Sequence, residues 1–149
     1  MDATALLFLL AFAAGVTLAA QPGVNAILAR GVGGPALAAL VSFIVGAAAL
    51  VIFAIIRRSP IPASETLASI PWWAWLGGLL GAFYVTVSII AAPQIGTGRF
   101  FAVVIAGQLF AGVLIDQFGL LGLPQRVLTL PRVLGLALLV AGVVLVRVG

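Results

Sequence analysis

Five long apolar runs, separated by short connections, constrain this chain more than any other feature. They cover residues 3–28, 34–56, 72–92, 100–118 and 132–147. A helix needs about 20 apolar residues to cross the roughly 30 Å hydrocarbon layer of a bilayer, and four of the runs reach about that length. The uncharged part of the last run, Val133 to Val146, is the shortest, and we expect its helix to extend by a residue or two at either end. We predict an all-α polytopic membrane protein with five transmembrane helices, forming a single domain over residues 1–149.

Composition excludes the other fold classes. Hydrophobic residues make up 64% of the chain and charged residues 7%, whereas about a quarter of an ordinary soluble domain is charged. So few charges cannot cover a soluble surface, and the abundance of apolar residues excludes disorder. A membrane β-barrel would show segments of alternating polarity, but these runs are unbroken, which favours helices.

The residue types that are missing exclude most chemistry. The chain has no Cys and no His, which removes disulfides, thiol nucleophiles, common zinc sites and imidazole catalysis. We find no nucleotide-binding loop or catalytic constellation, so we expect no cofactor, no metal and no enzyme activity. The net charge of +4 comes from arginines scattered between apolar runs. They are typical of membrane flanks rather than of a nucleic-acid surface, and we expect no nucleic-acid partner.

The first run and the first polar connection each allow two interpretations. Leu18-Ala19-Ala20 could be a signal cleavage site, but the amino end carries Asp2 and no positive charge, so we expect the run to remain as a span. The connection 59–69 is expected to be a loop, with a short interfacial turn starting near Ala63. Trp72, Trp73 and Trp75 follow it and are expected to anchor the chain at the lipid boundary.

The arginines are divided almost evenly between the two membrane faces. With five spans, Arg57, Arg58, Arg126 and Arg132 share the side of the amino terminus, and Arg30, Arg99 and Arg147 share the other. Four against three gives only a small preference for a cytoplasmic amino terminus. Such balance suits a chain that inserts in both directions, and two antiparallel copies would form an inverted-repeat homodimer.

Polar side chains inside the first and third runs are candidate solute contacts. Gln21 and Asn25 are four residues apart on one helical face, beside Pro22, which predicts a kink. Tyr84 and Ser88 share a face of the third span in the same way. For Gln21 and Asn25 the alternative is a hydrogen bond that joins helices, worth about 0.6–2 kcal/mol. For Tyr84 the alternative is a hydroxyl that is bonded to a neighbouring helix.

The fourth run contains Gln108 near its middle and Asp116 eight residues later. At 3.6 residues per turn the two lie about 80° apart and roughly share a side. Asp116 is the one acid inside a run. It is interpreted either as a solvated interfacial acid or as a proton or cation site that couples transport. The last run has no uncharged polar residue, so we expect it to face an oligomer contact rather than an aqueous path.

Motifs spread over the whole chain carry a family pattern. They comprise Gln21 to Leu28, Pro35 with Ser42-Phe43 and Gly46, Pro71-Trp72-Trp73 with Gly77-Gly78 and Gly81, Ala92 to Gly96, Ala106 to Leu109, Ile115 to Leu120, and Arg132 with Gly135 and Gly142. Together they resemble a bacterial five-helix family of the drug/metabolite transporter superfamily. The resemblance implies a small transporter of the inner membrane, with a site between two protomers. Related multidrug exporters use an acid in their first helix, where this chain has Gln21 and Asn25 instead.

Two functions follow as hypotheses. The first is a secondary transporter that moves a small polar or amphipathic solute by alternating access, with Gln21, Asn25, Tyr84, Ser88 and Gln108 as substrate contacts and Asp116 as the coupling residue. The second is a membrane scaffold, or an accessory subunit of a hetero-oligomer, that transports nothing alone. The small-molecule substrate and the lipid bilayer are the partners that the first hypothesis requires.

Overall fold

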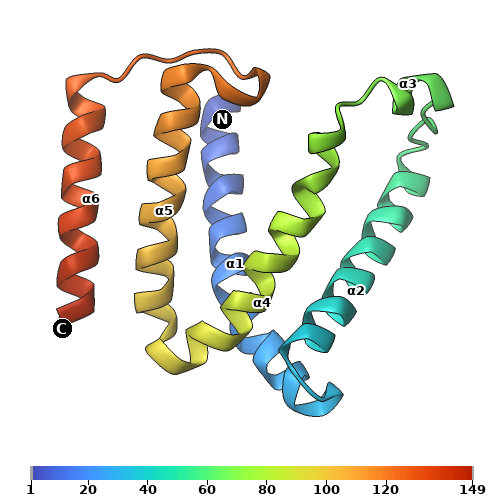
Figure 1. Ribbon diagram of the computed structural model, residues 1–149, viewed down its shortest axis with the longest axis horizontal. Coiled ribbons are helices and arrows are strands. Elements are labelled where there is room, and N and C mark those ends of the chain that lie inside the picture. Colours follow the sequence, from blue (N-terminus) through green and yellow to red (C-terminus); the bar gives the residue numbers. More distant parts are fainter. Residues whose placement is uncertain (1, 149) are drawn as a thin grey trace. The chain divides into compact units, whose positions relative to one another are not determined.

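The computed structural model describes residues 2–148, apart from the side chains of Ala3 and Arg147; the flanking charge predicted at Arg147 therefore lies outside the described side chains. Helices account for all of the regular secondary structure in this range, which confirms the all-α class (Figure 1). In chain order they are α1 (Ala3–Val32), α2 (Pro35–Ile56), α3 (Ser64–Ala68), the 3₁₀ turn η1 (Trp72–Leu76), α4 (Gly77–Ile95), α5 (Thr97–Phe118), the 3₁₀ turn η2 (Leu120–Gly122) and α6 (Leu130–Val148).

Four helical segments within the described residues are long and apolar enough to cross a membrane: Thr4–Val32, Pro35–Ile56, Trp72–Ile95 and Thr97–Phe118. A shorter apolar helix, Leu130–Val146, follows them. The chain divides into two compact units, Met1–Pro93 and Gln94–Gly149, which are called the amino-terminal and carboxy-terminal units below.

Helix ends differ from the predicted span ends for reasons of backbone geometry. The first helix continues past residue 28 to Val32, and Gly33 ends it with φ = 94°, a left-handed conformation that favours glycine. The third continues through Pro93 to Ile95, because proline removes only one helical hydrogen bond. The break between α4 and α5 is confined to Gly96, with φ = 89°, and α5 begins at Thr97.

The amino-terminal unit is built on a tight hairpin of α1 and α2, which are joined through Gly33 and Gly34 (Figure 1). Pro35 occupies the first turn of α2, where its missing N–H costs nothing. Ala38 and Ala39 of α2 are buried with Val85 and Ile89 of α4 in a small apolar cluster. The alanines permit this close packing because their side chains add little bulk.

The carboxy-terminal unit is a second hairpin, of α5 and α6, which lie side by side (Figure 1). The connection between them is folded back onto the end of α5. Gly119 ends α5 in a left-handed conformation with φ = 58°. A Cβ at this glycine would lie 3.4 Å from the Leu123 carbonyl oxygen, so the close approach of the connection also requires glycine.

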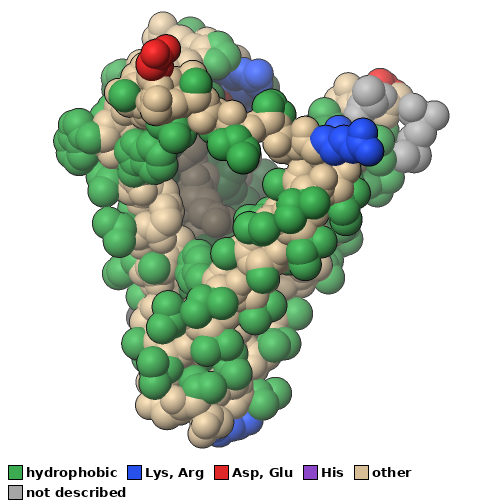
Figure 2. Space-filling view, turned by 90° about the vertical axis from the view of Figure 1, so that its right-hand side faces the viewer, with side chains coloured by type: hydrophobic (Ala, Val, Ile, Leu, Met, Phe, Trp, Pro, Cys, Tyr) green, Lys and Arg blue, Asp and Glu red, His purple; other side chains and the backbone are tan. Residues whose placement is uncertain are grey.

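Apolar side chains cover the outer faces of the helices. Phe8, Phe12, Leu80, Phe83 and Leu138 are examples that are at least two-thirds exposed. In the face that Figure 2 shows, apolar side chains extend along the helices and charged ones gather at helix ends. Exposing this much apolar surface to water would be costly, whereas lipid is as apolar as these side chains.

The segment between α2 and α4 agrees with its predicted form. Ser64–Ala68 forms the single helical turn α3, within the expected loop. Trp72, Trp73 and Trp75 lie in η1, and all three side chains are exposed. This placement at the start of a membrane-length helical segment suits an indole ring that has an apolar body and an N–H donor.

Candidate solute-binding site

Two of the predicted polar residues lie where α1 passes its proline. Pro22 is fully buried inside α1, and the helix ribbon bends in its second half (Figure 1). Proline lacks the backbone N–H and clashes with the preceding turn, which explains a bend at this position. The helical turn after Pro22 carries Asn25, whose side chain is buried with 3% exposure.

Asn25 makes a hydrogen bond to α2. The Ser42 hydroxyl donates to Asn25 Oδ1 at 2.9 Å. The amide Nδ2 of Asn25 is buried and has no hydrogen-bond partner among the described residues. An unsatisfied buried amide costs about 1–3 kcal/mol, and a functional role or a bound water is the usual reason why a native protein keeps one. The predicted interhelical hydrogen bond of Asn25 is therefore present, and its amide retains donor capacity.

Ser42 and Gln21 line one cavity, of about 310 Å³, in the amino-terminal unit. The other lining residues are apolar: Phe43, Gly46, Ala47, Leu50 and Val85. Gly81 of α4 approaches the Phe43 ring so closely that a Cβ there would lie 3.3 Å from Phe43 Cζ. The cavity thus combines two uncharged polar groups with an aromatic and aliphatic wall, which is the usual composition of a small-molecule site.

Tyr84 and Ser88 lie on α4 near this cavity but in a more apolar environment. Tyr84 packs against the cluster of Ala38, Ala39, Val85 and Ile89. Ser88 is 1% exposed, and its hydroxyl donates to the Val85 carbonyl at 2.8 Å within its own helix. Their roles as solute contacts remain predictions, and the geometry gives Ser88 an intrahelical bond instead.

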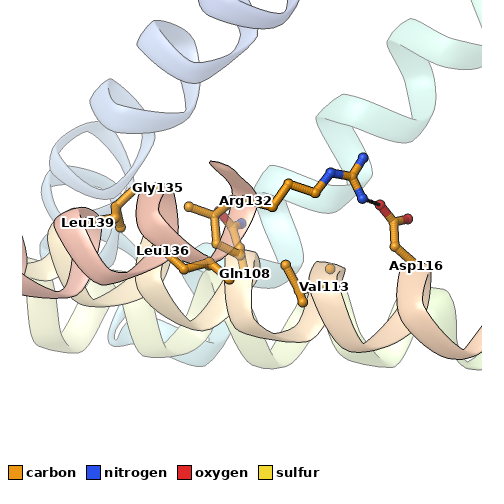
Figure 3. A pocket seen from close by; sticks show the side chains of 9 residues that line it. Gln108, Val113, Asp116, Arg132, Gly135, Leu136 and Leu139 are labelled. Carbon is orange, nitrogen blue, oxygen red and sulfur yellow. Dashed lines mark ion pairs between the residues drawn. The ribbon is translucent and has the colours of Figure 1, made fainter. Parts of the chain in front are cut away.

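The carboxy-terminal unit contains a second cavity, of about 500 Å³, lined by α5 and α6. Gln108 and Asp116 both line it, so the two residues share a side of α5 as their spacing predicts (Figure 3). Leu109, Gly112 and Val113 complete the α5 wall. Gly135, Leu136 and Leu139 of α6 form the opposite wall, so this helix lines a cavity despite its apolar sequence.

Asp116 forms an ion pair that spacing along the chain does not indicate. Its Oδ2 lies 3.5 Å from Arg132 Nη1 in the first turns of α6, and Figure 3 shows the arginine extended toward it. The side chains are 38% and 40% exposed, so the pair is partly solvated. A pair of this kind contributes little to stability, about 0–1 kcal/mol, but it places one positive and one negative charge at the cavity.

The connection between α5 and α6 holds this pair in place. The Arg126 N–H donates to the Asp116 carbonyl at 2.7 Å, and the Leu128 N–H donates to Gln117 Oε1 at 2.7 Å. Gln125 Nε2 in turn donates to the Gln117 carbonyl at 2.8 Å. These three bonds tie the connection to the end of α5, and so fix where α6 begins and where Arg132 projects.

The sequence analysis did not predict two of these polar contacts, Ser42 with Asn25 and Arg132 with Asp116. Ser42 could have been found from the hairpin, because Asn25 and Ser42 are equally far from the turn at Gly33 and Gly34. Residues equidistant from a tight turn face each other in antiparallel helices. Arg132 gave no such signal, because its position depends on how the connection before α6 folds.

Long apolar helices, the buried amide of Asn25 and cavities lined by polar groups define a polytopic helical membrane protein with sites for small molecules. The chain matches, over residues 6–145, the family model described as "Putative inner membrane exporter, YdcZ". It therefore belongs to this family, within the drug/metabolite transporter superfamily, and is a multi-pass protein of the bacterial inner membrane.

One curated relative supports the assignment. The "Inner membrane protein YdcZ" of Escherichia coli (strain K12) is 40% identical over 82 residues, which are 55% of this chain and 54% of the relative. The aligned region thus spans about half the length of that relative. No solved structure matches the chain.

Proposed function

We propose that this protein is a secondary transporter that moves a small polar or amphipathic solute across the inner membrane by alternating access. The observation that carries the proposal is the placement of uncharged amides at cavities between apolar helices. Gln21 lines the cavity of the amino-terminal unit, and Gln108 lines that of the carboxy-terminal unit. Polar groups at membrane depth cost free energy unless they find partners or water, so a solute path is a physical reason to keep them there.

The family description supports an export role, since the matching model is that of an inner membrane exporter. In this proposal Gln21 and Gln108 bind the solute through neutral hydrogen bonds, and Asn25 acts on it through the Ser42 hydroxyl. Tyr84 and Ser88 support the wall formed by α4. Asp116 couples transport to a proton or cation, and the Arg132 guanidinium competes with that proton or cation for the Asp116 carboxylate. Gly96, with φ = 89°, gives the chain a flexible point between α4 and α5.

The proposal includes five spans and two copies of the chain. The 19 residues of α6 extend about 28 Å at 1.5 Å per residue, close to the thickness of the hydrocarbon layer. Five spans put the termini on opposite faces, and the balanced arginines favour insertion in both directions. Two antiparallel copies then form a ten-helix inverted repeat, the arrangement in which many transporters place their site.

Dual insertion predicts a specific labelling pattern. With a reporter at either terminus, each end should be detected on both sides of the membrane in comparable amounts. A reporter assay in intact cells and in inverted vesicles measures this. A single orientation for all molecules would rule out the antiparallel dimer and leave the transport proposal in place.

Transport itself is tested by flux. Purified protein is first screened for thermal stabilisation by metabolites, because a ligand that binds only the folded state must stabilise it. We expect at least one stabilising compound to be carried into proteoliposomes at a rate well above that of empty liposomes. Stabilisation without flux would instead support the scaffold or accessory-subunit hypothesis.

A further inference from the structure

In the cavity lined by Gln21 and Ser42, a buried residue outside the lining determines whether the Ser42 hydroxyl can donate or accept a hydrogen bond. Ser42 lines the cavity, and behind it lies the buried Asn25. The Ser42 hydroxyl has one hydrogen and two acceptor lone pairs. That hydrogen is donated to Asn25 Oδ1 at 2.9 Å, so the oxygen that faces the cavity has only acceptor capacity left.

We propose that this cavity selects an uncharged amphipathic molecule whose polar end donates a hydrogen bond to Ser42. The proposal rests on the proposed transport function and names the class of its substrate. Ser42 is the specificity-determining residue, and Asn25 is a positioning residue that orients the Ser42 hydroxyl. Neither the family description nor the name of the relative gives a role to Ser42.

The rest of the lining decides the charge and shape of the occupant. Phe43, Leu50 and Val85 offer an aromatic and aliphatic surface to an apolar body, and none of the described residues that line the cavity is charged. Burying an ammonium ion without a counter-charge costs far more than burying a hydroxyl that is hydrogen-bonded. A neutral hydroxyl or N–H group is therefore preferred over a protonated amine.

The volume is suitable for such a molecule. The cavity measures about 310 Å³, and an engineered cavity of about 150 Å³ in another protein holds benzene. A substituted benzene ring therefore fits. Gln21 adds an amide that can donate or accept, so it strengthens binding without changing which polarity Ser42 requires.

Three probes with one carbon skeleton test the proposal: 1-phenylethanol, acetophenone and 1-phenylethylamine. The alcohol carries a neutral donor, the ketone only an acceptor, and the amine a charged donor at pH 7. Binding is measured by ligand-observed NMR on the detergent-purified full chain. We expect the alcohol to bind about tenfold more tightly than the ketone, the ratio that one net hydrogen bond supplies, and more tightly than the amine.

Two variants locate the effect. In Ser42→Ala the alcohol-to-ketone ratio should fall to about one, because the acceptor is gone. In Asn25→Leu the Ser42 hydrogen is released and can bind a carbonyl, so the ketone should gain affinity relative to the alcohol. The matched control is Ser69→Ala, which removes a hydroxyl bonded to the Thr66 carbonyl in the α3 segment. It should leave the ratio unchanged.

The outcomes separate this inference from the proposed function. Equal binding of ketone and alcohol by the wild-type protein overturns the inference, and so does tighter binding of the amine. If the protein still transports a solute in either case, only the substrate class is wrong. If no probe binds and no solute is transported, the proposed function fails with it. The wild-type ratio decides the inference even if a variant fails to fold.

Discussion

Replacing Gln108 or Asn25 with alanine is expected to lower solute flux in proteoliposomes by at least about tenfold, with the purified protein still folded. Each substitution removes a hydrogen-bonding amide at or behind a cavity. A tenfold change in rate corresponds to about 1.4 kcal/mol, which is close to the net free energy of one hydrogen bond. Asn25→Ala also removes the acceptor that orients Ser42. The measurement is initial flux at equal protein content, with size-exclusion chromatography to check folding.

A matched amide outside the cavities provides the control for Gln108. Gln94 lies near the carboxyl end of α4, where its side chain is exposed. Gln94→Ala removes an amide that lines neither cavity, so flux should change by less than about twofold. Unchanged flux in both Gln108→Ala and Asn25→Ala would remove these residues from the site.

Asp116→Asn is expected to abolish the dependence of flux on pH. Asp116 is the one acidic residue within the described parts of the membrane-length helices, and it lines the same cavity as Gln108. Asparagine keeps the shape but cannot take up or release a proton, and it no longer pairs with Arg132. Flux is measured against pH on both sides of the liposome membrane, for the variant and the wild-type protein.

Loss of folding does not explain the expected result, because the Asp116–Arg132 pair is more than a third exposed and contributes little to stability. Asp2→Asn is the control: Asp2 caps α1 by accepting from the Thr4 N–H at 3.3 Å, and it lines neither cavity. It should leave the pH profile as in the wild type. A pH profile that survives in Asp116→Asn would reject Asp116 as the proton carrier.

The helices could be predicted because each apolar run is long and bounded by arginine, proline or glycine. Their ends could not be predicted to the residue, since a helix is held by backbone hydrogen bonds and continues beyond the apolar side chains. Thus α1 includes Arg30 and stops only at Gly33, where the backbone turns left-handed. Likewise α4 passes Pro93 and stops at Gly96.

The site was predictable only in part. Periodicity correctly put Gln108 and Asp116 on one side of α5, since both line one cavity. It could not identify Arg132 as the partner of Asp116, because that contact depends on three hydrogen bonds made by the connection before α6. Periodicity also identified Asn25 as a polar contact but not its partner Ser42. That partner could have been predicted, because Asn25 and Ser42 are equally far along the chain from the turn at Gly33 and Gly34.

The central claim is that the polar residues of this chain line a solute path while its apolar faces meet lipid. The chain has no cysteine, so single cysteines can be introduced without background and labelled in membranes with a water-soluble maleimide, which reacts with the thiolate. Cysteine in place of Gln21, Ser42 or Gln108 should react at least about tenfold faster than cysteine in place of Phe12 or Leu138. At the latter two positions the thiol would face lipid, and an apolar environment disfavours the thiolate that reacts with maleimide. Equal labelling at all five positions, or faster labelling at Phe12 and Leu138, would contradict the account.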